Sequence, residues 1–426
     1  MSRSPKLVLA IAGLAYLIAV TQRSSLGVAT LIASERFDTN AQQLATLAVF
    51  QLVVYAGMQI PVGILLDRFG AKRLLIVGAL IMAIGSFTVA LAPNLGTAIF
   101  GRMLVGMGDS FTFISMIRMV NGWYHGSKAS SMQQNVSTVG QLGQFLSAVP
   151  FWFLLESTGW IPAFSFISIV SLVVVILLIA FTSDDDSNHA HVKTKTATLK
   201  IASKQLLENT KNPGIRMAFW THFVTQPTTT SVSLLWAVPF LVTAERQTHD
   251  FAALTLTSMV IFGLITGPII GRICARHPEK RALVVYLVVG LTTLTWLIIV
   301  SIPGQILSPL LLVFFLLISI GGPASMIAFD FTKDIVSKDR LGSANGFANV
   351  GGFLASFVMM YLTGLVIDVV QATTGSAERY TIEAFRWGFA SQLLVIGVGL
   401  TFFTLERRKH LLLASDSGNS SNKPAV

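Results

Sequence analysis

Long apolar stretches recur along the whole chain. Twelve of them are long enough to cross about 30 Å of hydrocarbon, because an α-helix rises about 1.5 Å per residue. Only 12% of the 426 residues are charged and 53% are hydrophobic, which excludes an ordinary soluble domain. The pattern predicts an all-α membrane protein with twelve transmembrane helices near residues 7–33, 41–66, 74–92, 96–120, 131–155, 160–182, 214–243, 251–275, 281–302, 306–330, 341–367 and 383–405.

A polar segment divides these stretches into two groups of six. We therefore expect an N-terminal six-helix half over 1–182, a cytoplasmic linker over 183–213, a C-terminal half over 214–405 and a cytoplasmic tail over 406–426. The second part of the linker places leucines among lysines. That composition fits either a short amphipathic helix on the membrane surface or a solvated tether.

An internal repeat supports the division into halves. The segment from Ser115 to Asn135 matches the segment from Ser325 to Asn345 at a spacing of 210 residues. Both segments run from the end of the fourth apolar stretch of a half into the fifth. The match predicts two pseudo-symmetric halves.

The basic residues sort by loop. Most of the 30 Lys and Arg residues lie on one predicted side of the membrane. They come before the first stretch, in the loops on the same side as the N-terminus, or in the tail. By the positive-inside rule both termini should be cytoplasmic, in a plasma (inner) membrane. The net charge of +10 then reflects topology, and no nucleic-acid partner is expected. Four arginines fall on the opposite side: Arg36, Arg246, Arg379 and Arg386.

The sequence offers little support for catalysis. Its single cysteine, Cys274, excludes an internal disulfide and a cysteine-based metal site. No phosphate-binding G-x-x-x-x-G-K-[ST] loop and no cluster of nucleophile and base are present. We therefore expect no enzymatic activity, no cofactor and no metal, and a monomer whose partners are the lipid bilayer, a small solute and a coupling ion.

A charged motif with two glycines, G-I-L-L-D-R-F-G-A-K-R, joins the second and third stretches at residues 63–73. Gly63 should let a neighbouring helix approach, and Gly70 should permit a sharp turn. Asp67 ends an apolar stretch and needs a partner, either another helix's N-terminus or a nearby cation. The motif predicts a conformational latch, with Arg68, Lys72 and Arg73 as the cations.

Charged residues inside the apolar stretches are candidates for function, because a charge in mid-membrane costs several kcal/mol unless it is paired or hydrated. Arg23 lies just beyond the centre of the first stretch. Arg102 and Asp109 are about two turns apart and share one face of the fourth, where Asp109 is near the midplane. Arg118 and Asp330 come near the cytoplasmic ends of two stretches and are candidates for a gate.

Uncharged polar residues accompany these charges. Tyr55 lies on a polar face of the second stretch, and His222 and Gln226 lie in the seventh. Such side chains must face protein or water and not lipid. Together with Arg23 and its neighbour Gln22, we expect them to contact the substrate; helix packing is the alternative for His222 and for the glutamines.

The motif at residues 63–73 resembles the loop between helices 2 and 3 of the major facilitator superfamily, and the resemblance extends over the whole chain. It implies two six-helix halves that rock around a central site lined by helices 1, 4, 7 and 10. Arg23, Arg102, Asp109 and the polar residues of the seventh stretch would then surround one space.

Two further segments resemble the anion:cation symporter branch of that superfamily. Residues 23–29, R-S-S-L-G-V-A, are similar to its R-x-N-L-S-V-A, and residues 102–109, R-M-L-V-G-M-G-D, to its R-x-x-x-G-x-x-E. In that group the first motif's arginine meets the substrate carboxylate and the second motif's acid takes part in proton coupling. The resemblance implies these roles for Arg23 and Asp109. The sequence departs from the pattern at Gln22, where an acid is common.

We therefore expect a secondary active transporter that uses alternating access and couples a proton to symport of an organic anion. Protonation of Asp109, with Arg102 nearby, would free Arg23 to hold the anion. A purely structural pair of Asp109 with Arg102 is the alternative for that site. Proton-driven efflux of a drug or metabolite, and a membrane sensor that does not transport, are the alternatives for the whole protein.

Overall fold

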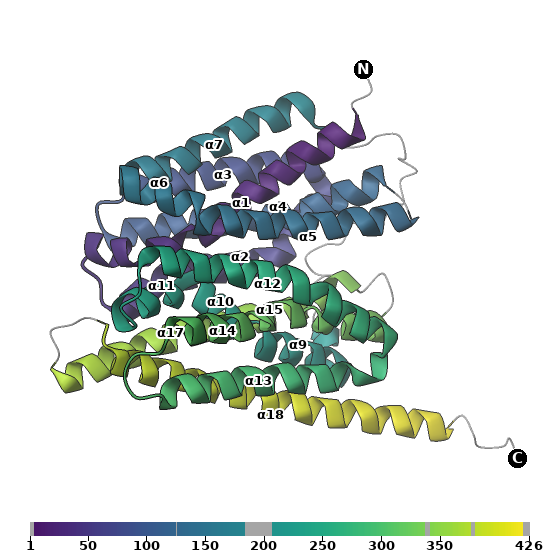
Figure 1. Cartoon of the computed structure of the whole chain (residues 1–426). Helices are drawn as coiled ribbons and strands as arrows, with labels where there is room; N and C mark the ends of the chain where they lie inside the picture. Colours follow the sequence, from purple (N-terminus) through teal and green to yellow (C-terminus); the bar gives the residue numbers. More distant parts are fainter. Residues whose placement is uncertain (1–3, 125, 184–206, 337–340, 376–379, 421–426) are drawn as a thin grey trace, which may run out of the picture.

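The computed structural model describes residues 4–124, 126–183, 207–336, 341–375 and 380–420, and all regular secondary structure in these ranges is helical (Figure 1). Within them, 11 helices are long and apolar enough to cross a membrane. The predicted fifth span is built instead from α5 (Gly126–Ala148) and the short α6 (Pro150–Thr158). The all-α membrane fold predicted from the sequence is confirmed.

Besides α5 and α6, the N-terminal half contains α1 (Pro5–Arg36), α2 (Ala41–Phe69), α3 (Ala71–Leu91), α4 (Leu95–Trp123) and α7 (Trp160–Phe181). These helices begin and end at recognisable signals. Asn40 caps α2 by accepting the backbone N–H of Gln43, and Gly70 turns the chain between α2 and α3 with a φ of 81°. Tight glycine contacts join α3 to α4: a Cβ on Gly85 would lie 2.8 Å from the Gly101 carbonyl oxygen.

The C-terminal half has more interruptions. Its membrane-crossing segments after the first are α12 (His249–Arg276), α13 (Arg281–Ser301), the group α14 (Ser308–Ser319), α15 (Gly321–Ala324) and α16 (Ile327–Ile335), then α17 (Leu341–Thr374) and α18 (Ile382–Ser420).

The seventh span is the most irregular. It consists of α9 (Pro213–Thr225), α10 (Pro227–Ser231), a π-helical turn η1 (Val232–Trp236), α11 (Ala237–Pro239) and a second π-helical turn η2 (Phe240–Ala244). Pro227 removes a backbone donor directly after α9, which explains the first break. Gly27 of α1 lies against η1, where a Cβ would come 2.5 Å from the Ser233 carbonyl oxygen. The first helix of one half therefore touches the irregular part of the other.

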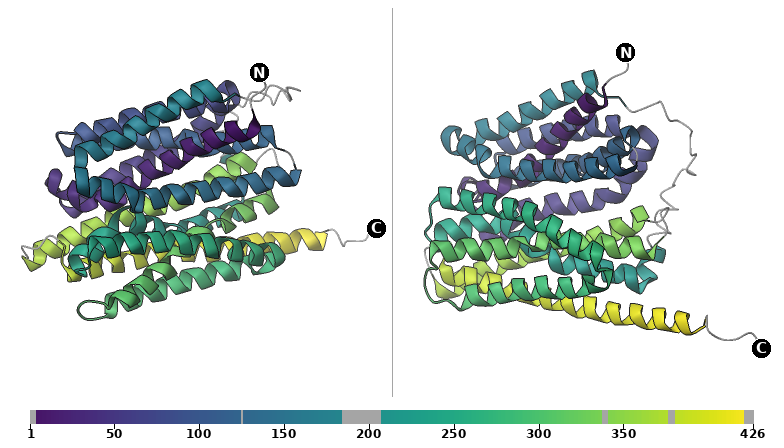
Figure 2. Two further views of the ribbon diagram at one scale, coloured as in Figure 1. Left: turned by 45° about the horizontal axis from the view of Figure 1, so that its top comes forward. Right: turned by 45° about the vertical axis from the view of Figure 1, so that its right-hand side comes forward.

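The two halves lie one above the other, and both chain ends lie at the same end of the bundle (Figures 1 and 2). We call this the terminal end and the opposite one the far end. Among described residues, the hydrogen bonds and ring contacts between the halves run from the pair Tyr55–Phe353, with ring centroids 5.0 Å apart, to the far end. The structure is therefore the conformation in which the far end is closed.

Candidate functional site

Arg23 and Asp109 form an ion pair between the middles of α1 and α4. The Arg23 Nη1 atom lies 3.2 Å from Asp109 Oδ2, and the two side chains are 17% and 1% exposed. Thr112 contributes a hydroxyl hydrogen bond of 3.4 Å to Asp109 Oδ1. A carboxylate this deep in the membrane is stabilised by such a partner. Two residues chosen from the sequence for their charge thus lie together.

The pair is next to the contact between the halves. The Arg23 guanidinium carbon lies 5.6 Å from the centre of the Tyr55 ring, and that ring packs against Phe353 of α17. Tyr16 of α1 interacts with the same guanidinium. Arg23 is therefore a partly exposed cation at the junction of the two halves, in a shell of aromatic groups that favour a cation.

Arg102 holds the backbone of α1. Its Nη1 atom donates to the Gln22 carbonyl oxygen at 3.1 Å and to Ser25 Oγ at 3.3 Å, and its Nη2 atom donates to the Arg23 carbonyl oxygen at 2.9 Å. The alternative in which Arg102 is the ion-pair partner of Asp109 is wrong for this conformation, because Asp109 pairs with Arg23. Helix α4 thus fixes Arg23 twice, through its backbone and through its side chain.

Gln22 is buried and faces the interior of the N-terminal half. Its side-chain amide donates to Ser171 Oγ and, at 3.4 Å, to the Ile167 carbonyl oxygen, and its Oε1 atom accepts from Ser86 Oγ at 2.5 Å. These bonds tie α1 to α3 and α7. They correct the expectation that Gln22 contacts substrate, because both ends of the amide are used within the bundle.

His222 and Gln226 lie on α9 and at its end. His222 is 1% exposed, and its ring centroid is 5.4 Å from that of Phe329 on α16. Its Nδ1 atom closely approaches Gly352 of α17, where a Cβ would also meet Gln226 Oε1 at 3.0 Å. The structure supports the packing interpretation for His222. Gln226 is half-buried, and its contact with substrate stays a prediction.

The predicted gate residues lie on opposite halves. Arg118 is an exposed side chain near the terminal end of α4, and Asp330 is half-buried on α16. In this conformation these two described side chains form no ion pair with each other. A gate between them requires the terminal end to close, so it stays a prediction.

The latch motif has several roles in the structure. Gly70 makes the predicted turn, and Lys72 Nζ donates to the carbonyl oxygens of Ile179 and Thr182 at 3.1 and 2.7 Å, which caps the C-terminus of α7. A Cβ on Gly63 would meet nothing within 4 Å, so the expected close helix approach is wrong for this conformation.

The remaining latch residues lie at the terminal end. The Arg68 guanidinium is 5.1 Å from the centre of the Phe69 ring, and Arg73 is exposed. Asp67 is in the last turn of α2, and its side chain lies outside the part of the chain that the structure describes. Its partner stays a prediction.

Several residues of the junction were missed by the sequence analysis. Tyr16 could have been found, because it lies about two turns before Arg23 on α1. Phe353 and Gly352 carry no local signal, because their partners lie on other helices.

Comparisons with known proteins agree with this architecture. A family model of the Major Facilitator Superfamily matches residues 12–359, with a second match over 228–425. The hexuronate transporter of Bacillus subtilis (strain 168) is 22% identical over 385 residues, which cover 85% of this chain and 88% of that protein. A probable sulfoacetate transporter of Cupriavidus necator is 25% identical over 186 residues, less than half of either chain (44% and 43%).

Solved structures show the same fold. A bacterial homologue of the human lysosomal transporter Spinster, inward-facing and occupied, aligns with a TM-score of 0.76 at 13% identity and covers 96% of this chain and 98% of its own. A nucleoside transporter aligns with a TM-score of 0.73 at 14% identity, over 93% and 100% of the two chains.

Proposed function

Because the chain belongs to the Major Facilitator Superfamily of membrane transporters, we propose that it carries an organic anion across the membrane together with a proton. The observation that carries this proposal is the Arg23–Asp109 ion pair at the junction of the halves. The names of two relatives, a hexuronate transporter and a probable sulfoacetate transporter, support an organic acid as the solute.

Arg23 is the residue that selects an anion. A fixed guanidinium in a medium of low dielectric attracts a carboxylate or sulfonate and repels a cation more strongly than it would in water. Its planar fork of donors matches both kinds of oxyanion. The aromatic groups around it add no competing negative charge, and Asp109 is the group that the substrate must replace.

Asp109 is the proton carrier in this proposal. When its carboxylate binds a proton, the charge that holds Arg23 is removed and the guanidinium is free to bind the substrate anion. When the anion leaves, Arg23 attracts Asp109 again and the proton is released. Arg102 keeps α1 in place throughout, because its hydrogen bonds go to two carbonyl oxygens and one serine hydroxyl of α1 and not to the titrating group.

The distribution of basic residues supports an orientation for the protein in the membrane. With both termini in the cytoplasm, the far end faces outward and the structure is inward-facing. Rocking of the halves about the site would then exchange the closed far end for a closed terminal end, with the latch motif and the pair Arg118 and Asp330 at the end that closes.

Uptake by purified protein in vesicles tests the proposal. Labelled glucuronate and sulfoacetate are offered outside at pH 6 with the interior at pH 8, and a labelled organic cation serves as the contrast. We expect gradient-driven uptake of an anion, its loss in Arg23→Ala, and its retention in the matched control Arg36→Ala, which removes an exposed arginine from the same helix.

Two outcomes would overturn the proposal. Wild-type uptake in Arg23→Ala vesicles would exclude the anion site. Uptake of the cation, or anion uptake of equal rate with and without the pH gradient, would exclude anion selectivity or proton coupling respectively.

A further inference from the structure

Tyr16 of α1 lies beside Arg23, and the exchange of proton and anion proposed above gives it no role. It is buried, at 8% exposed, and its hydroxyl accepts a hydrogen bond from the Arg23 guanidinium, which has donors only. Tyr16 precedes Arg23 by seven residues, about two helical turns, so both lie on one face of α1. Side chains on a helix incline toward its N-terminus, and the long Arg23 side chain therefore extends back toward this hydroxyl.

Three helices of the N-terminal half fix the Tyr16 side chain. Its ring centroid lies 5.6 Å from that of Phe113 on α4. A Cβ on Gly140 of α5 would come 2.9 Å from the Tyr16 hydroxyl oxygen and 3.1 Å from its Cε1 atom. Only a residue without a side chain leaves the hydroxyl this space. Helices α1, α4 and α5 together thus hold the hydroxyl next to the guanidinium.

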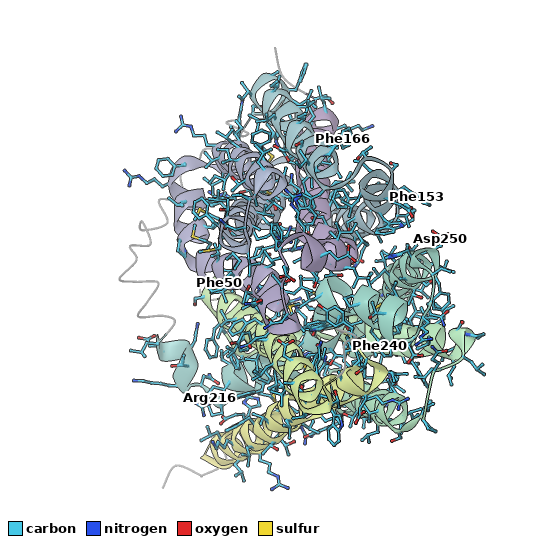
Figure 3. All side chains as sticks on the ribbon, turned by 90° about the vertical axis from the view of Figure 1, so that its left-hand side faces the viewer. Phe50, Phe153, Phe166, Arg216, Phe240 and Asp250 are labelled. Carbon is cyan, nitrogen blue, oxygen red and sulfur yellow. The ribbon has the colours of Figure 1, made fainter. Side chains whose placement is uncertain are left out.

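Tyr55 of α2 also faces Arg23, but its position depends on the other half. Its ring packs against Phe353 of α17, with centroids 5.0 Å apart. Figure 3 looks along the bundle and shows Phe50, which is also on α2, at the border between the two halves. This ring contact is lost if the halves rock apart at the far end. The two contacts that hold the Tyr16 side chain lie within one half, so they persist in both conformations.

The proposed exchange leaves the guanidinium without its anionic partner for part of the cycle. Protonation of Asp109 removes the charge that holds Arg23, and ordering a free arginine side chain opposes the binding of an anion. A neutral hydrogen-bond acceptor can keep the guanidinium in place without competing for its charge. The phenol oxygen of Tyr16 is such an acceptor.

We propose that Tyr16 is a positioning residue, which holds the Arg23 guanidinium at the junction of the halves while Asp109 is protonated. This inference rests on the proposed function, because it assigns Tyr16 a role within that exchange. The anion then meets a site that is already ordered, and the cost of ordering the arginine is not subtracted from its affinity.

The contribution of the Tyr16 hydroxyl depends on the state of Asp109. When Asp109 is ionised, the ion pair orders Arg23 with or without the hydroxyl, whereas a neutral Asp109 leaves this ordering to Tyr16. Among the described residues, the charged or titratable groups that interact with Asp109 are Arg23 and Tyr16 of α1, Tyr55 of α2 and Arg102 of α4. Phenols stay neutral and guanidinium groups stay charged between pH 5.5 and 8.5, so Asp109 sets the pH dependence.

Calorimetric titration of the full-length protein with glucuronate or sulfoacetate tests the proposal. Tyr16→Phe keeps the ring and its contact with Phe113 and removes only the hydroxyl. We expect its anion affinity to be about fivefold below that of the wild type at pH 5.5 and within about twofold at pH 8.5. In the Asp109→Asn background, Tyr16→Phe should lower the affinity about fivefold at both pH values.

Two further variants complete the test. Tyr286→Phe removes the hydroxyl contact with Thr404 in the C-terminal half, at 3.0 Å, and should leave the affinity and its pH dependence unchanged. Gly140→Ala places a methyl group against the Tyr16 hydroxyl and should lower the affinity in the Asp109→Asn background, as Tyr16→Phe does.

The pH dependence separates positioning from other roles. A loss in Tyr16→Phe that is equal at both pH values, as expected of a direct contact with the anion or of a general structural defect, would overturn the proposal. So would an unchanged affinity of Tyr16→Phe in the Asp109→Asn background. A wild-type affinity that does not change with pH would overturn the proposed function itself, whereas the first two results leave that function standing.

Discussion

The two halves share a fold but differ at the depth of the site. In the N-terminal half α1 and α4 carry three charges within the membrane-spanning region, Arg23, Asp109 and Arg102, which are linked by one ion pair and by hydrogen bonds. At the corresponding depth the seventh span has two π-helical turns and two prolines, Pro227 and Pro239, with no charged residue between residues 217 and 244.

One charged pair and one buried carboxylate of the C-terminal half lie toward the two ends of the bundle and not at the depth of the site. Arg216 pairs with Glu406 at 2.8 Å near the terminal end, and Glu245 accepts the Ile306 N–H at 2.7 Å at the far end. These contacts join neighbouring segments of the same half. The two halves therefore share an architecture, but among the described residues only the N-terminal half has charged side chains at the depth of the site, where the C-terminal half has an irregular backbone instead.

The largest effect should come from removing the cation of the N-terminal half. Arg23→Ala should weaken binding of the transported anion at least about 100-fold, because a charge-assisted and bidentate contact is lost. Isothermal titration calorimetry measures this. Arg23→Lys should bind with intermediate affinity, and equal affinities of Arg23→Ala and wild type would place the anion elsewhere.

The next largest effect, on the rate of uptake, should come from replacing Asp109, the acid of the same half. Asp109→Asn mimics the protonated state, so uptake driven by a pH gradient should fall to background while exchange of substrate for substrate continues. Both rates are measured on one vesicle preparation. If both activities fall together with thermal stability, Asp109 is a structural partner of Arg23 and not a proton carrier.

The comparison also applies to the loops that join the second and third helices of each half. Asp67→Asn should lower transport velocity about threefold to tenfold at normal expression, since it removes a helix-end interaction of the closed terminal end. Gly271 lies near the end of α12, the second span of the C-terminal half, and has open space around its Cβ position. Gly271→Ala is therefore the matched control, and equal velocities for Asp67→Asn and wild type would contradict the latch.

The smallest effect should come from the C-terminal half, in which the seventh span has no charged residue at the depth of the site. His222→Asn should lower the melting temperature, because the ring is buried against α16 and α17, but change anion affinity by less than about twofold. Thermal unfolding and titration on the same sample separate the two. A tenfold loss of affinity at unchanged stability would give the C-terminal half a direct role in binding.

Much of the fold was predictable because the bilayer dictates it. Apolar stretches of the right length had to be helices, since backbone groups in lipid must be satisfied within the segment. The breaks were harder to predict. Pro150 and Pro227 are visible in the sequence, but whether a proline bends, ends or merely begins a helix depends on the neighbours that satisfy the freed backbone groups.

The site was predictable in its residue types and not in its pairing. Arg23, Arg102 and Asp109 stood out because intramembrane charge is costly. Their partners depend on how α1 is rotated against α4, which no local pattern encodes. The same rotation separates Gln22 from Arg23: neighbours on a helix point about 100° apart, so one faces α3 and α7 while the other faces the junction.

The most direct test of the central claim, that Asp109 and the substrate anion compete for Arg23, is the pH dependence of anion affinity in the wild type and in Asp109→Asn. Calorimetric titration with glucuronate or sulfoacetate from pH 5.5 to 8.5 should show wild-type affinity falling as pH rises, because ionised Asp109 occupies the guanidinium. In Asp109→Asn the affinity should be high and independent of pH. An Asp109→Asn protein that keeps the wild-type pH dependence, or that loses binding as Arg23→Ala does, would contradict the account.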